Sequence, residues 1–155
     1  MLLIDQKLLN GIYAQSEKCY PHEACGFVVG KVEGKKRTAY KVVACTNIQN
    51  ELHEKDPERY PRAAETAYCI DPAEMKKIEE QAKKEGMSLV SIFHSHPEHG
   101  VYFSAEDKAM ACPWGEPLFP HLSYLVVSVY QMKVNNASEF YWSAEKKDFV
   151  ERKIL

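Results

Sequence analysis

Hydrophobic residues recur at helical spacing near the start of the chain. Leu8, Leu9 and Ile12 fall on one face after Asp5, which can cap the first turn, so we expect a helix from this cap to about Lys18. The stretch "DPAEMKKIEEQAKKEG" gives the clearest helical signal, with Asp71 as N-cap, Pro72 at the first position, Glu74 completing a capping box and Gly86 ending the helix. Two shorter helices are expected, one beginning at Ser104 and one running from Ser143 to the end.

Continuous or alternating apolar runs bounded by turn residues predict the strands of a sheet. The runs at 25–30 and 37–45 flank Gly34 and predict a hairpin, while the nearly continuous run at 88–96 predicts a buried strand. Further strands are expected at 66–70, 121–130 and 139–142.

These elements mix strands and helices without regular βαβ alternation. The pattern favours an α/β protein of the α+β type, with a mixed sheet flanked by a few helices. A chain of 155 residues fits one domain, which we assign to residues 1–155. Residues 46–66 are polar, contain two prolines and have no period, so a long irregular loop is expected there.

Composition and charge narrow the function classes. The net charge of -2, with lysines and acids interspersed, leaves no basic stripe for nucleic acid. The apolar runs are too short to span a bilayer, and the N-terminus lacks a basic leader region, so neither a membrane nor a secretory role is expected. Five dispersed cysteines predict reduced thiols and a cytoplasmic location.

The stretch "SIFHSHPEHGVYFSAED" contains the candidate chemistry. His94 and His96 are two apart at the end of a predicted strand, so both side chains project from one face and suit a shared metal ion. Asp107 could return a carboxylate to this pair, because Ser104 and Asp107 form a helix-start signature that would hold the acid rigidly. Two histidines and one aspartate leave a fourth position for water, as in catalytic zinc sites.

Each of these residues also has an ordinary explanation. An HxH pair at a strand end is more often two polar side chains than two ligands, and a capping role alone explains Ser104 and Asp107. Glu23 is a candidate general base, although the residues alone do not bring it to the histidines. His22 and His99 are expected in loops, His121 at a strand entry, and Cys112 as a packing or spectator residue rather than a ligand.

The spacing of five residues resembles a known enzyme family. Glu23, "HSHP" at 94–97 and "SAED" at 104–107 match E…H-x-H-x(7)-S-x-x-D, the motif of the JAMM (MPN-type) zinc metalloproteases. The strand context "YPHEACGFVVG" is similar too, and the resemblance covers roughly residues 1–130, pointing to the short stand-alone prokaryotic branch. Signatures of other hydrolase and nucleotide-binding families, such as HExxH, GxSxG and the P-loop, are missing.

The resemblance implies a mainly antiparallel curved sheet of the cytidine-deaminase-like type and one Zn²⁺ per chain. His94, His96 and Asp107 would hold the metal with water as fourth ligand. Glu23 would transfer the proton from that water to the leaving amine, and Ser104 would stabilise the oxyanion or position the water. The family further implies cleavage after the C-terminal glycine of a ubiquitin-like protein or a β-grasp sulfur carrier, whose extended tail would lie along a strand edge.

Two other functions are compatible with the same motif. Another zinc hydrolase, acting on a cell-wall or phage-tail peptide, and a non-catalytic MPN-type scaffold are the alternatives. The released amine, the oligomeric state, any activating partner and the role of loop 46–66 are not determined. Trp114 lies in a proline-rich stretch without a family match, and we expect it to pack against the core.

Overall fold

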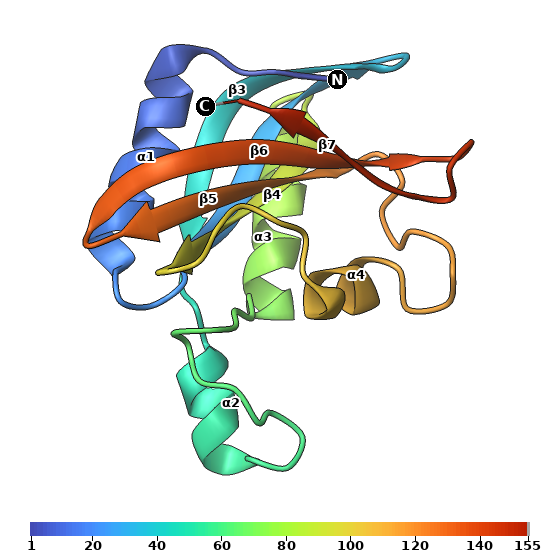
Figure 1. The fold of residues 1–155 in the computed structure, drawn as a ribbon. Helices are drawn as coiled ribbons and strands as arrows, with labels where there is room; N and C mark the ends of the chain where they lie inside the picture. The colour runs from blue at the N-terminus through green and yellow to red at the C-terminus, as the bar shows by residue number, and fades with distance from the viewer. Residues whose placement is uncertain (155) are drawn as a thin grey trace.

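The computed structural model describes residues 1–154 as one curled seven-stranded sheet with four helices (Figure 1). The strands, in the spatial order β1-β3-β2-β4-β5-β6-β7, are β1 (Leu2–Leu3), β3 (Lys36–Cys45), β2 (Cys25–Glu33), β4 (Ser88–Pro97), β5 (Ser123–Tyr130), β6 (Lys133–Ser143) and β7 (Asp148–Lys153). The pairs β1–β3 and β4–β5 are parallel and the other neighbours are antiparallel. The predicted class, a mixed and mainly antiparallel sheet flanked by helices, is therefore confirmed.

The helices cover both faces of the sheet. They are α1 (Gln6–Cys19), α2 (Gln49–Lys55), α3 (Pro72–Lys84) and α4 (Ala105–Ala111). One apolar cluster joins α1 to one face through Ile12, Val28 and Phe93, whereas α3 and α4 lie on the other face, over Phe27 and Ile92 (Figure 1). Helix α2 projects away from the sheet. Within residues 1–154, no helix combines the length and apolar character needed to cross a membrane.

Most of the expected boundaries are confirmed by the structure. Asp5 caps α1 through the amide of Leu8, at 2.8 Å. Gly34, at φ 61°, forms the turn between β2 and β3, a left-handed conformation that favours glycine. Asp71 caps α3 through the amide of Ala73, one position earlier than the expected capping box with Glu74 requires.

The expected C-terminal helix after Ser143 is wrong. Residues 148–153 form β7, which pairs antiparallel with β6. The Ser143 hydroxyl accepts the amide of Lys146, and Lys147 turns the chain at φ 50°, so the chain folds back into a hairpin. The open edge of β6 satisfies the backbone groups of this segment, and this tertiary pairing overrides its helical propensity.

The segment between β3 and α3 also differs from expectation. Residues 46–66 contain the helix α2 rather than only irregular chain, and the strand expected at 66–70 is absent. The backbone of Cys69 bonds to Ile48 and to the Asn47 side chain instead of to a neighbouring strand. Tyr68 and Ile70 nevertheless pack on the core face that carries α3.

Candidate metal centre

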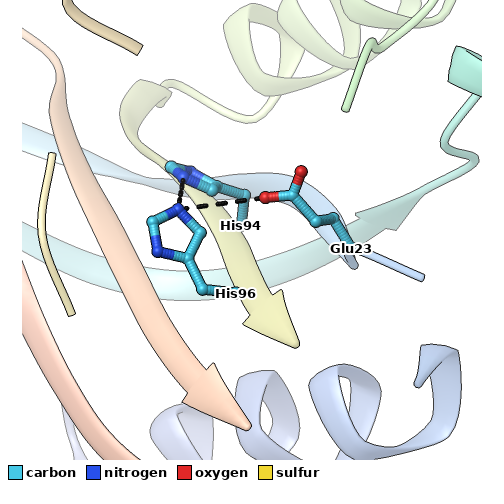
Figure 2. Close-up of side chains that lie close together, drawn as sticks. All are labelled: Glu23, His94 and His96. Carbon is cyan, nitrogen blue, oxygen red and sulfur yellow. Dashed lines mark hydrogen bonds and ion pairs between the residues drawn. The ribbon is translucent and has the colours of Figure 1, made fainter. Parts of the chain in front are cut away.

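His94 and His96 lie at the carboxyl end of β4, between β2 and β5. Strand alternation directs both imidazoles to the α3 and α4 face, and their exposed fractions are 0% and 6%. The two Nε2 atoms are 3.2 Å apart (Figure 2). The predicted projection of this pair from one face is therefore present, in a buried setting.

Asp107 reaches the pair from the first turn of α4. Its Oδ2 lies 3.3 Å from His94 Nε2 and 3.8 Å from His96 Nε2. The same oxygen accepts the backbone N–H of Ser104 at 2.9 Å, and the Ser104 hydroxyl accepts the N–H of Asp107 at 3.0 Å. This complete capping box fixes the carboxylate, so capping the helix and facing the histidines are compatible.

The spacing of these three atoms fits one small cation. Ligand atoms held tetrahedrally at roughly 2.0–2.1 Å from zinc stand about 3.3 Å from one another. The three separations here are 3.2, 3.3 and 3.8 Å. Two neutral imidazoles and a carboxylate are also a usual donor set for catalytic zinc. The residues therefore fit a zinc ion with a fourth position left open.

The two histidine rings are held in different ways. His96 Nδ1 lies 3.0 Å from the carbonyl of Gly100, so Nδ1 carries the proton. The lone pair of Nε2 is therefore free to bind a metal ion. His94 Nδ1 is buried without a hydrogen-bond partner, and its ring instead stacks on Tyr68 with centroids 4.6 Å apart. Sequence reasoning missed Tyr68, because no local pattern places it over β4.

Glu23 comes to this site through the register of the sheet. It lies two residues before β2, whose first residue, Cys25, is the strand partner of His94. The Oε1 atom lies 3.9 Å from His96 Nε2, and Oε2 is buried without a partner (Figure 2). Glu23 is only 4% exposed. The structure therefore brings together all five predicted site residues, with Ser104 joined to Asp107 and Glu23 beside the histidines.

Two overlapping sets of ligands are possible here. Glu23, His94 and His96 offer donor atoms that all lie within 4.8 Å of one another. Asp107 approaches the histidines more closely, at 3.3 and 3.8 Å, and is rigidly capped, whereas Glu23 is 3.9 Å from His96. We therefore favour Asp107 as the third ligand, which leaves the unpartnered Glu23 carboxylate beside the open position.

The electrostatics of the centre favour a bound cation. Burial, reinforced by the charge of Asp107, raises the pKa of Glu23 to about 9. Burial lowers the pKa of His94, against the pull of Asp107, so its imidazole is neutral. Burial raises the pKa of Asp107. The two histidines and the hydrogen bond to Ser104 lower it by more, so the pKa lies well below the ordinary value. Without a cation Glu23 is therefore protonated at neutral pH, and a bound cation would favour its charged form.

A cleft of about 690 Å³ opens over these residues. Glu23, His96 and Asp107 line it, together with Ser104. One wall is formed by residues 59–69, after α2, and the other by residues 102–110, around α4. Arg62 and Glu106 bridge the two walls at 2.6 Å. The site is therefore accessible to a ligand, and part of the long segment after β3 forms one of its walls.

The remaining candidates lie around the centre rather than in it. His22 is exposed and pairs with Glu65 at 3.4 Å, His121 precedes β5, and Cys112 is the half-buried C-cap of α4. His99 lines the cleft, and its carbonyl accepts the hydroxyl of Ser128. Trp114 is 82% exposed, so the expectation that it packs against the core is wrong.

Comparison with known proteins agrees with the architecture. The chain resembles the solution structure of a protein from Desulfitobacterium hafniense, with 25% identity, a TM-score of 0.75, and coverage of 100% of this chain and 92% of that one. A solution structure from Salinibacter ruber has 22% identity and a TM-score of 0.66 over 97% of this chain and 88% of that one, which supports the fold alone. Among curated proteins, no sequence matches significantly.

A family model supplies the assignment. The model described as prokaryotic homologs of the JAB domain matches residues 5–143, which include Glu23, both histidines, Ser104 and Asp107. This match covers most of the chain, and the chain therefore belongs to the family of prokaryotic homologues of the JAB domain.

Proposed function

We propose that this protein is a zinc-dependent peptidase or isopeptidase. The observation that carries the proposal is the triangle of His94 Nε2, His96 Nε2 and Asp107 Oδ2, with edges of 3.2, 3.3 and 3.8 Å, beneath an open cleft. The family assignment supports it, because the JAMM motif that the chain carries is that of zinc metalloproteases. Zinc held by these residues would polarise the scissile carbonyl and lower the pKa of a water toward about 7.

Glu23 is the residue that moves the proton. Its carboxylate lies beside the triangle, and its Oε2 is free of any hydrogen-bond partner. A nearby cation favours the charged form of this buried acid, so it can accept a proton from the attacking water. Glu23 then passes that proton to the leaving amine.

Ser104 contributes a hydrogen bond at the same end of the cleft. Its hydroxyl oxygen already accepts the amide of Asp107 at 3.0 Å, which leaves the hydroxyl proton available to donate. A donor placed there would stabilise the oxyanion as the carbonyl is attacked. Ser104 is therefore assigned two tasks, one in capping α4 and one in the reaction.

The substrate we propose is a ubiquitin-like or β-grasp sulfur-carrier protein, cleaved after its C-terminal glycine. A narrow, extended tail suits a cleft whose two walls are 59–69 and 102–110. Neither wall is a strand: 59–69 is irregular and 102–110 is mostly the helix α4, so the tail would bond to the irregular backbone of 59–69 rather than to a strand edge. The cytoplasm, where such carriers act, is the proposed location.

Hydrolysis of purified carrier conjugates tests this function. We expect cleavage that is lost with a chelator and restored by zinc. Cleavage of a cell-wall peptide but not of carrier conjugates would support the other zinc-hydrolase hypothesis. A chain that purifies without zinc and cleaves neither would support a non-catalytic scaffold.

A further inference from the structure

The position of the Glu23 carboxylate depends on its backbone. Its Oε2 has no partner, and its Oε1 is 3.9 Å from the nearest ring nitrogen of His96. The side chain is thus not fixed by a hydrogen bond of its own. The backbone, by contrast, is bonded on both sides: the N–H donates to Ala64 at 2.7 Å, and the carbonyl accepts from the Asn47 side chain at 3.0 Å.

Asn47 has all four of its side-chain hydrogen-bonding positions occupied. Its Nδ2 donates to the carbonyls of Glu23 and Ala67, at 3.0 and 3.1 Å. Its Oδ1 accepts the amides of Gln49 and Cys69, at 3.0 and 3.1 Å. Two carbonyls face one end of the amide and two N–H groups face the other, which fixes its orientation. One side chain therefore joins the start of β2, the start of α2 and the cleft wall.

The wall that Asn47 holds contacts the metal centre directly. Ala67 and Cys69, its two partners there, flank Tyr68, whose ring stacks on His94 at 4.6 Å. All three of these wall residues line the cleft. A displacement of Asn47 would therefore move the Glu23 backbone and the Tyr68 ring together.

We infer that Asn47 is a positioning residue that sets the Glu23 carboxylate and the Tyr68 wall relative to the metal centre. The inference rests on the proposed function where it concerns hydrolysis. It assigns a task to the segment after β3, which otherwise carries no candidate chemistry. Asn47 acts through Glu23 and the wall, and it is itself neither a ligand nor a proton carrier.

The variants Asn47→Asp and Asn47→Ala separate the hydrogen bonds that Asn47 donates from those that it accepts. Asp keeps the acceptor oxygen and removes both Nδ2 donations, whereas Ala removes all four bonds. Asn136→Ala is the matched control, because Asn136 is a half-buried asparagine on β6 whose Oδ1 accepts the Ala137 amide at 2.9 Å. If Asn47→Ala folds poorly, Asn47→Asp still carries the test.

For N47D we expect kcat to fall roughly 10- to 100-fold, as for a misplaced catalytic group. KM and zinc affinity should stay within about threefold, because the zinc ligands lie on β4 and α4. N136A should leave all three quantities unchanged. Unchanged kcat, or a loss of zinc affinity that parallels the loss of kcat, would overturn the inference.

Amide hydrogen exchange tests the same inference without a substrate. In N47D the Glu23 amide should exchange about tenfold faster or more, and in N47A the Cys69 amide should also exchange faster. The Val126 amide, buried on the central strand β5, should stay protected in both variants. If no conjugate is cleaved by the unmodified protein, the proposed function fails, yet the exchange result still decides the role of Asn47. Unchanged exchange at Glu23 would overturn that role.

Discussion

The Oδ2 atom of Asp107 lies 3.3 Å from Nε2 of His94, although the two residues belong to different elements. His94 is placed by the pairing of β4 with β2 and β5, and Asp107 by the capping box that begins α4. The first turn of α4 therefore holds the Asp107 carboxylate next to His94 at the end of β4. Such preorganised ligands bind a metal ion without first having to be ordered.

Replacing Asp107 by Asn should separate metal binding from helix capping. The amide can still accept the Ser104 N–H, so we expect a loss of no more than about 1 kcal/mol in stability. Removing a residue that only hydrogen-bonds to a metal ligand typically lowers metal affinity about 10- to 100-fold. Because Asp107 is itself a proposed ligand, removing its charge should lower zinc affinity about 100-fold or more. Competition with a chromogenic chelator measures the change. E106Q, one residue earlier on α4, should retain the original affinity.

His96 and His99 provide a second matched pair. His96 faces the centre with a free Nε2, whereas His99 is exposed and lies outside the triangle. We expect H96A to purify with much less than one zinc per chain and H99A with the same content as the unmodified protein. Elemental analysis distinguishes them. Equal zinc in H96A and H99A would exclude the assigned ligand set.

The raised pKa of Glu23 predicts a pH-dependent stability in protein stripped of metal. Its folded pKa is about 9, against an ordinary value of 4.5, so the folded state binds the extra proton between these two values. The free energy of unfolding should therefore fall as pH rises through this window, by at most about 1.4 kcal/mol per pH unit. Urea unfolding at several pH values should show this slope reduced in E23Q. The exposed-turn variant E145Q should keep it.

Glu139 should be the most sensitive acid in the sheet. It is fully buried on β6 and bonds to Arg37 at 3.3 Å and to Arg152 at 2.7 Å. Arg152 also donates to the carbonyl of Leu2 at 2.6 Å, which ties β7 to β1. Removing one partner of a buried ion pair costs about 3–5 kcal/mol, so E139A should lose about that much in guanidinium unfolding. E145A should lose almost nothing.

The parts of the site that the sequence predicted are those set by local geometry. Strand alternation alone places His94 and His96 on one face, and the S-x-x-D spacing alone gives the capping box of Ser104 and Asp107. Glu23 required the family resemblance, because its approach depends on the pairing of Cys25 with His94 across the sheet.

The parts that were missed depend on distant partners. Nothing near Asn47 indicates that its amide will meet Glu23, Ala67 and Cys69, and nothing near Tyr68 indicates a stack on His94. The helix expected after Ser143 failed for the same reason, since the edge of β6 converts that segment into β7. In that segment tertiary pairing overrides local propensity, whereas the contacts of Asn47 and Tyr68 depend on residues far away in the sequence.

The central claim is that Glu23 drives hydrolysis at a zinc centre that it does not itself hold. The most direct measurement compares the unmodified protein with E23A, recording zinc content and hydrolysis of a carrier conjugate on the same samples. We expect about one zinc per chain in both proteins, with a loss of at least 100-fold in kcat for E23A. Full activity in E23A, or loss of zinc from it, would contradict the account.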